Sequence, residues 1–156
     1  ARWLFGVDID DVTVVVQPQS VIHSMVQYVD GSIIAQLGCP DMRLPIQYAL
    51  YYPERKPMDI ARLDFAKLAS ITFEVPDMVN FKGLALAYKA GRRGGNLPTI
   101  LNAANEFAVA QFLGRKCGFL DITDMIEKAM DCIQYIDNPD VNDILDTEKA
   151  VYEFLR

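Results

Sequence analysis

The stretch that decides the fold runs over residues 17–43, QPQSVIHSMVQYVDGSIIAQLGCPDMR. Two runs of apolar and β-branched residues flank Asp30-Gly31, a dipeptide typical of the type I′ hairpin turn, which needs φ > 0 at both central positions. A two-residue turn at this point fixes the register of the two strands. The expected cross-strand pairs are Tyr28 with Ile33, Val26 with Ala35 and Ser24 with Leu37. These residues form an apolar face, which we expect to be buried.

The opposite face of the predicted hairpin carries the only histidine of the chain, His23. It is expected to lie with Val21, Met25 and Gln27 against Ile34, Gln36 and Gly38. A histidine among amides and a methionine suits a surface that meets a ligand or a partner subunit. A lone histidine on a strand is also a common structural residue, so the residues alone allow both roles.

The rest of the chain predicts strands first and helices later. Gly6 is expected to close a helix turn over residues 1–6, and residues 12–16 read as a buried strand. Asp41 is the expected N-cap of a helix to Tyr51. Residues 53–80, with three prolines, read as a linker that contains one extended strand over 68–74. Amphipathic helices are expected at about 81–91, 99–113, 121–135 and 146–154.

The predicted fold class is therefore α+β, with a partial mixed β-sheet and its hairpin followed by a C-terminal four-helix bundle. The expected division is residues 1–52 as the end of an α+β domain, 53–80 as the linker and 81–156 as a helical domain.

Composition excludes several classes of function. The chain is 51% hydrophobic and 23% charged, with a formal net charge of −6, so nucleic acid and anionic membrane surfaces are not expected partners. No apolar run approaches the roughly 18 residues of a membrane span. Three widely spaced cysteines without a CxxC pattern are typical of reduced thiols.

Two motifs have a simple structural alternative. Asp8, Asp10 and Asp11 offer oxygen ligands to a hard cation, but acids in a loop are usually solvated, and we predict no metal site. The glycine-rich run 91–96 suggests a phosphate cradle, yet it lacks the strand-before and helix-after context of nucleotide fingerprints. A helix C-terminus followed by a turn accounts for it.

Four stretches in this order resemble 1-deoxy-D-xylulose 5-phosphate reductoisomerase. They are ARWLF at 1–5, the run 18–43, LASITFEVPD at 68–77 and LNAANE at 101–106. The resemblance covers nearly the whole chain but only about the last two-fifths of the family's polypeptide. One departure is Gln17, where many members carry histidine, and this glutamine excludes acid–base chemistry at that position.

The resemblance implies an enzyme that uses NADPH and Mg²⁺ or Mn²⁺ to rearrange and reduce deoxyxylulose phosphate to methylerythritol phosphate, in isoprenoid biosynthesis. It implies a homodimer in the bacterial cytoplasm or a plastid. Some residues match the family's pocket, and others match a helical segment that covers it. These candidates are Ser20, His23, Pro40, Met42, Asn102, Asn105 and Glu106. Core filling by Met42, and a solvent-facing stripe for the three residues at 102–106, are the structural alternatives.

The family's dinucleotide fingerprint, its Asp-Ser-Glu metal ligands and its phosphate-holding residues have no counterpart here. No catalytic set is complete, so we expect neither NADPH nor a metal to bind this chain alone and expect it to be inert without the missing N-terminal and catalytic segments. A stand-alone dimerising or binding module is the alternative. An independent enzyme built on Asp8, Asp10, Asp11 and His23 lacks an evident nucleophile and oxyanion site.

Overall fold

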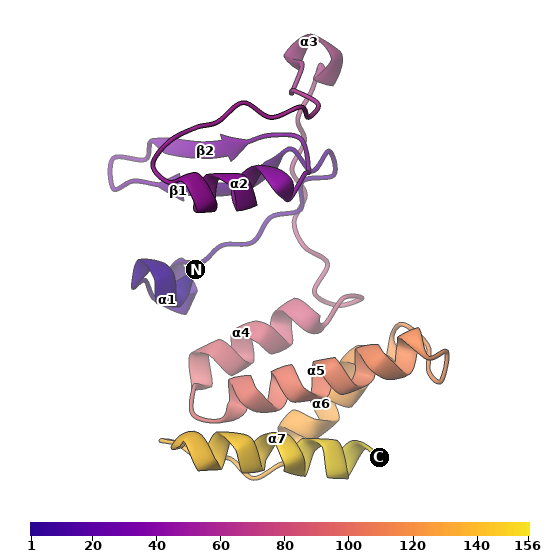
Figure 1. Ribbon diagram of the computed structural model, residues 1–156. Coiled ribbons are helices and arrows are strands. Elements are labelled where there is room, and N and C mark those ends of the chain that lie inside the picture. Colours follow the sequence, from indigo (N-terminus) through magenta and orange to yellow (C-terminus); the bar gives the residue numbers. More distant parts are fainter. The chain divides into compact units, whose positions relative to one another are not determined.

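The computed structural model describes residues 1–156, which form two compact units. One unit joins residues 1–14 to residues 76–156, and the other comprises residues 15–75. Each unit is described by itself below, with the elements labelled in Figure 1. None of the helices combines the length and the hydropathy that crossing a bilayer demands. The predicted domain boundaries at 52/53 and 80/81 refer to the longer family polypeptide and stay a prediction.

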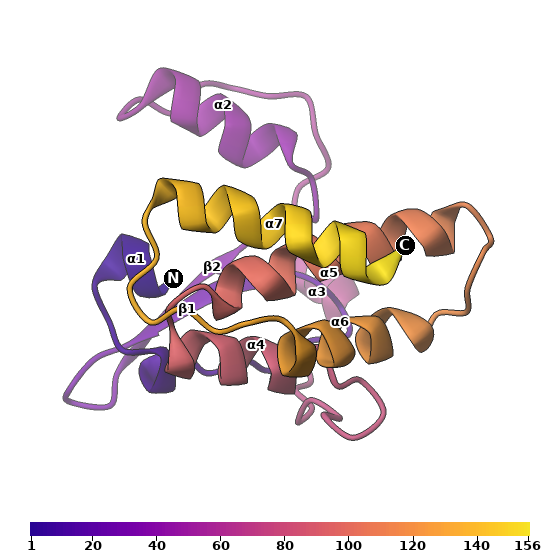
Figure 2. The same ribbon diagram turned by 90° about the horizontal axis from the view of Figure 1, so that it is seen from below.

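Four helices of the first unit share one core: α4 (Gly83–Arg93), α5 (Leu97–Leu113), α6 (Asp121–Cys132) and α7 (Val141–Leu155). Both views of the chain show α5 between α4 and α7 (Figures 1 and 2). The buried core residues come from all four helices: Leu86, Ala90, Leu97, Ile100, Ala103, Ala104, Ile126, Ala129, Met130 and Val151. Burial of this apolar surface is the main stabilising term of the unit. The more specific four-helix bundle geometry stays a prediction.

The starts and ends of these helices depart from the sequence prediction. Helix α7 begins at Val141, five residues earlier than expected, because Asp140 and Asp143 form a reciprocal capping box. Helix α6 ends at Cys132 rather than near Tyr135. The backbone after α6 makes a hydrogen bond to another segment instead: the Ile136 carbonyl accepts from the backbone N–H of Asn96 at 3.0 Å.

The turn between α4 and α5 requires glycine at one position. Gly95 has φ +58°, and a Cβ placed on it would lie 2.4 Å from the Ile136 carbonyl oxygen. Gly94 also has a positive φ of +68°, but open space surrounds it. A tight connection between two packed helices therefore explains the run 91–96, as the sequence suggested, except that α4 continues through Gly91 to Arg93.

The N-terminal residues pack against α4. Helix α1 (Arg2–Phe5) ends at Gly6 in the left-handed conformation, which confirms the expected helix end. The short 3₁₀ helix η1 (Ile9–Asp11) brings Ile9 so close to Gly91 that a Cβ there would lie 2.9 Å from it. The Tyr88 hydroxyl of α4 donates a hydrogen bond at 2.6 Å to the carbonyl oxygen of Val12, the residue that follows η1, and so holds Val12 against α4.

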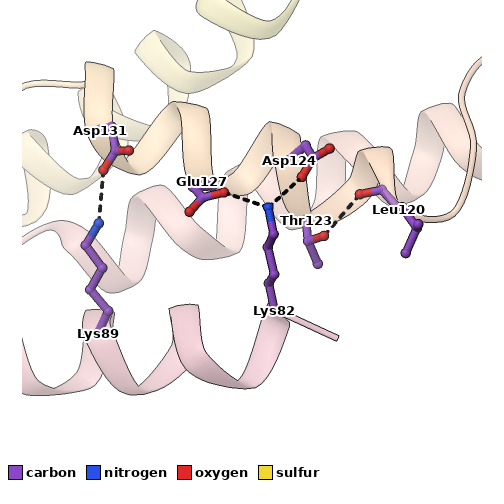
Figure 3. A network of polar contacts seen from close by, with 7 residues as sticks. All are labelled: Lys82, Lys89, Leu120, Thr123, Asp124, Glu127 and Asp131. Carbon is purple, nitrogen blue, oxygen red and sulfur yellow. Dashed lines mark hydrogen bonds and ion pairs between the residues drawn. The ribbon is translucent and has the colours of Figure 1, made fainter. Parts of the chain in front are cut away.

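Ion pairs join α4 to α6 along their exposed sides (Figure 3). Lys82 Nζ lies 3.1 Å from carboxylate oxygens of both Asp124 and Glu127, and Lys89 pairs with Asp131 at 2.9 Å. The hydrogen bonds and charges of Glu127 and Asp124 raise the pKa of Lys82 above its ordinary value. Because these groups are exposed, water and salt screen the network, and it adds little to the apolar core.

The second unit contains the hairpin of β1 (Ile22–Gln27) and β2 (Ile33–Leu37), which are antiparallel. The predicted register is wrong by one residue: Met25 pairs with Ala35, and Gln27 with Ile33. Residues 28–32 connect the strands, and the Tyr28 backbone N–H donates to the Ser32 carbonyl oxygen at 2.9 Å. Only Gly31 adopts a positive φ (+85°), while Asp30 accepts a hydrogen bond from the Ser32 backbone N–H at 2.9 Å. A type I′ turn would need positive φ at both positions.

Two other predicted strands are wrong in extent. Of residues 12–16 only Val16 pairs, and its partner is Glu74 in an isolated antiparallel bridge. Helix α3 (Phe65–Leu68) occupies the start of the segment expected to be extended. A strand exists only through its ladder partners, and within this chain each of these segments has a single bridge. The sheet of this unit thus has two strands, and the α+β class is confirmed.

Helix α2 (Arg43–Tyr51) begins two residues after the expected position. In Figure 2 it stands apart from the hairpin, and apolar side chains such as Ile46 and Leu50 are exposed on it. Val21 is the only buried residue between positions 15 and 75. Local hydrogen bonds, rather than a core of its own, therefore account for the order of this unit.

Candidate functional site

The site residues expected from the sequence divide between the two units. Ser20, His23, Pro40 and Met42 belong to residues 15–75, whereas Asn102, Asn105 and Glu106 lie on α5 of the other unit. The geometry of each group follows separately.

Ser20 lies in a tight turn that precedes β1. Its φ is +52°, a left-handed conformation that is uncommon outside glycine, and its backbone N–H donates to the Gln17 carbonyl oxygen at 3.0 Å. The Gln17 side chain closes the turn from the other side, since its Oε1 accepts from the backbone N–H of Val21 at 2.8 Å. The turn leaves the Ser20 residue exposed.

His23 occupies a β-bulge. Ile22 pairs with Leu37 and Ser24 with Gln36, so His23 is the extra residue without a backbone partner. Bulges redirect side chains at functional sites. Its Nδ1 lies 3.1 Å from Gln36 Oε1, within hydrogen-bond distance. The expected meeting of His23 with Gln36 is confirmed, although the register differs.

Pro40 and Met42 are exposed at the start of α2, and Met42 retains 71% of its accessible surface. Within this chain Met42 therefore fills no core. Asp41 between them accepts from the Arg43 backbone N–H at 2.9 Å and pairs with the Arg43 guanidinium. These bonds, with that of the guanidinium first, lower the pKa of the Asp41 carboxyl, so it stays ionised and stabilises the helix start.

On α5, Asn102 and Glu106 form one exposed polar cluster with Tyr152 of α7. The Asn102 Nδ2 donates to Glu106 Oε1 at 3.2 Å, and the Tyr152 hydroxyl donates to Glu106 Oε2 at 3.3 Å. Partial burial and then the Glu106 charge raise the pKa of Tyr152 above its ordinary value. Asn105 is half-buried and takes no part in these bonds. The cluster leaves amide and carboxylate groups exposed at the surface.

The residues that could hold a metal do not converge. No group of three histidine, cysteine or acidic side chains lies close enough to share an ion. In the acidic loop, Asp8 accepts from the Asp10 backbone N–H at 3.0 Å, and Asp10 pairs with Arg92 Nε at 2.7 Å. The first interaction caps η1 and the second links η1 to α4, and both are structural roles.

Three amide side chains were missed by the sequence prediction. Gln17 binds the backbone of the turn before β1, and Gln19 binds the backbone of Thr72. Asn96 is fully buried between α5 and the segment after α6. Asn96 stands at the N-cap of α5, but its side chain makes no cap hydrogen bond and binds residues far along the chain, so the local capping pattern does not reveal its role. The partners of Gln17 lie two to five residues further on, whereas Thr72, which Gln19 binds, lies 53 residues away, where no local pattern could reveal it.

The hairpin with His23 in its bulge and the helical unit of α4 to α7 make this an α+β protein. A family model for the C-terminal domain of DXP reductoisomerase matches residues 37–154. The chain belongs to the 1-deoxy-D-xylulose 5-phosphate reductoisomerase family.

Relatives and solved structures agree on how much of the family's polypeptide is present. The 1-deoxy-D-xylulose 5-phosphate reductoisomerases of Lachnospira eligens and Agathobacter rectalis are 63% and 59% identical over 155 residues, which are 99% of this chain and 41% of each relative. The Zymomonas mobilis enzyme in complex with NADPH superimposes with a TM-score of 0.89 at 42% identity, covering 99% of this chain and 41% of that one. The chain thus spans about two-fifths of the length of its curated relatives.

Proposed function

We propose that this chain supplies the C-terminal part of a 1-deoxy-D-xylulose 5-phosphate reductoisomerase, which rearranges deoxyxylulose phosphate and reduces it to methylerythritol phosphate. The observation that carries the proposal is 63% identity over 99% of the chain to a relative of that name. A second support is a solved DOX-P reductoisomerase in complex with NADPH, fosmidomycin and magnesium, which matches with a TM-score of 0.92 at 38% identity. We place the enzyme in the bacterial cytoplasm or a plastid.

In this proposal the chain forms walls of the substrate pocket. Ser20 and His23 offer a hydroxyl and an imidazole from the turn and bulge of β1, and exposed Met42 offers an apolar surface at the start of α2. Pro40 restricts the backbone of the segment that leads to Met42. Asn102, Asn105 and Glu106 form part of the cover over the pocket, where amide and carboxylate groups orient hydroxyls of a sugar phosphate by hydrogen bonds.

We expect the cofactors to bind to other parts of the enzyme. Residues of this chain do not fit a Mg²⁺ or Mn²⁺ site, since no three suitable ligands converge and the Asp10 carboxylate forms an ion pair with Arg92. The glycine-rich turn does not fit NADPH, because Gly95 is packed against the Ile136 carbonyl. We therefore propose that the metal and NADPH bind to residues outside this chain and that the chain is inert by itself.

The experiment is a comparison of the chain alone with a chimera. The chimera joins the N-terminal three-fifths of the Lachnospira eligens relative to this chain, which replaces the region of 63% identity. Consumption of NADPH with deoxyxylulose phosphate and Mg²⁺ is expected for the chimera and not for the chain alone. Exposed Trp3, the only tryptophan, reports NADPH binding to the chain by fluorescence, and no saturable change is expected. A folded but inactive chimera, or turnover by the chain alone, would refute the proposal.

The exposed hairpin supports a second candidate, a dimerising or binding module without catalysis. Val26 and Ile34 face each other across β1 and β2, yet remain 47% and 63% exposed. Apolar strands with free edges favour pairing with another chain, so we propose that this unit contributes to a homodimer. Sedimentation of the chain and of the chimera separates the candidates: a module dimerises alone and gives an inactive chimera, whereas the enzyme part yields an active dimeric chimera.

A further inference from the structure

We propose that Gln17 is a positioning residue, whose carboxamide clamps the turn over residues 17–22 and thereby sets where Ser20 and His23 lie. The inference rests on the proposed function in one respect, namely that these two residues line the substrate pocket. The clamp itself is argued from hydrogen bonds within the unit of residues 15–75.

The acceptor side of the clamp binds the first residues of β1. Gln17 Oε1 accepts from the backbone N–H of Val21 at 2.8 Å and from that of Ile22 at 3.3 Å. Both donors are partly buried and would otherwise need water or another acceptor. The two bonds tie the residue before the turn to the residues after it, so the chain between them has little freedom.

The donor side of the clamp reaches a distant segment through a second amide. Gln17 Nε2 donates to Gln19 Oε1 at 2.5 Å. That oxygen also accepts from the Thr72 backbone N–H at 3.2 Å, while Gln19 Nε2 donates to Thr72 Oγ1 at 2.8 Å. The backbone N–H groups dictate the orientation of both amides, because each can meet only a carboxamide oxygen.

The clamp accounts for two unusual features beside it. Ser20 is held at φ +52°, a conformation that is unfavourable for a residue with a Cβ and needs surrounding bonds to persist. His23 follows directly after Ile22, the second residue that Gln17 binds, and its bulge begins there. A looser turn would let the bulge shift and would separate His23 Nδ1 from Gln36 Oε1.

The clamp needs a hydrogen-bond acceptor and a hydrogen-bond donor at the end of one side chain. An amide supplies both and carries no charge. Methionine has the length of glutamine but neither group. Glutamate keeps the acceptor and loses the donor. Gln17→Met therefore removes the whole clamp, and Gln17→Glu removes only the link to Gln19 and Thr72.

The test is amide exchange and imidazole NMR on the 156-residue chain and on Gln17→Met, Gln17→Glu and the control Gln27→Met. Gln27 is an exposed strand glutamine without a side-chain hydrogen bond. In Gln17→Met we expect the amides of Val21 and Ile22 to exchange about tenfold faster, as the loss of a net hydrogen bond predicts. The single histidine needs no assignment, and its imidazole ring resonances are expected to shift and broaden.

The glutamate variant separates positioning from a general loss of structure. Gln17→Glu should keep slow exchange at Val21 and the native His23 resonance while exchange at Thr72 accelerates, and the control should match the natural chain. Native His23 signals in Gln17→Met, or a Gln17→Glu variant that behaves like Gln17→Met, would overturn the inference. None of these measurements depends on turnover, so an inactive chimera would count against the proposed function and leave the clamp untouched.

Discussion

Replacement of Asn96 by alanine should destabilise the helical unit more than any other amide substitution in the chain. The side chain is fully buried and makes three hydrogen bonds. Its Nδ2 donates to the Gln134 carbonyl oxygen and to Thr147 Oγ1, both at 3.0 Å, and its Oδ1 accepts from the Ile136 backbone N–H at 2.9 Å. The residue thus joins the start of α5 to the segment after α6 and to α7.

The expected loss follows from those bonds. A net hydrogen bond contributes about 0.5–1.5 kcal/mol, and a buried partner left without one costs about 1–3 kcal/mol. Asn96→Ala removes three bonds and leaves three partners in a region that water enters poorly, so we expect a loss of about 2–5 kcal/mol in the free energy of unfolding. Domains of this size have about 5–15 kcal/mol in total, so the change is large.

Chemical denaturation followed by circular dichroism measures the effect. The matched control is Asn102→Ala in the same helix, an exposed asparagine with one hydrogen bond at 3.2 Å, for which we expect a change within about 0.5 kcal/mol. A double-mutant cycle with Thr147→Val should show a coupling of at least about 0.5 kcal/mol. A loss below about 1 kcal/mol for Asn96→Ala would refute the reasoning.

Further predictions concern backbone strain, ionisation and charge. Gly95→Ala should lower the melting temperature well below that of Gly94→Ala, because both have positive φ but only at Gly95 would a Cβ meet a backbone oxygen; equal losses would contradict this. Tyr152, followed by NMR of its ring, should ionise above its ordinary pKa, and Glu106→Gln should lower that pKa. Since the unfolded chain releases this proton first, stability should fall as pH rises past the ordinary value. Lys82→Met should lower the melting temperature slightly at low salt and not at high salt.

Sequence patterns predicted the helical unit well because its signals are local. Helices α4 to α6 lie near the expected ranges, and the turn after Arg93 carries the expected glycines. The start of α7 was missed because a capping box with two aspartates, Asp140 and Asp143, stood after a proline that suggested a longer break. The hairpin register failed for a similar reason: Asp-Gly allows more than one turn type, and the Asp30 bond to Ser32 selects the longer loop.

The candidate site was less accessible to sequence reasoning than the fold. The resemblance to the family supplied Ser20 and Met42, which no periodicity could have done, whereas His23 was already a candidate as the only histidine of the chain. Sequence alone also could not show that His23 occupies a bulge, because a bulge depends on the partner strand. From the sequence, Gln17 indicated only that acid–base chemistry is excluded at its position. The structure adds its hydrogen bonds across the turn.

The two units differ in what keeps them ordered, and this difference bears on how substitutions act. Residues 83–155 have a shared apolar core, so changes there act on stability through burial and unsatisfied polar groups. Residues 15–75 bury only Val21, and amide hydrogen bonds fix their turns. Local bonds of this kind each contribute little to global stability, yet they decide where Ser20 and His23 lie. Variants of the turn should therefore change the geometry of the proposed pocket before they change the unfolding transition, whereas variants of α5 should do the reverse.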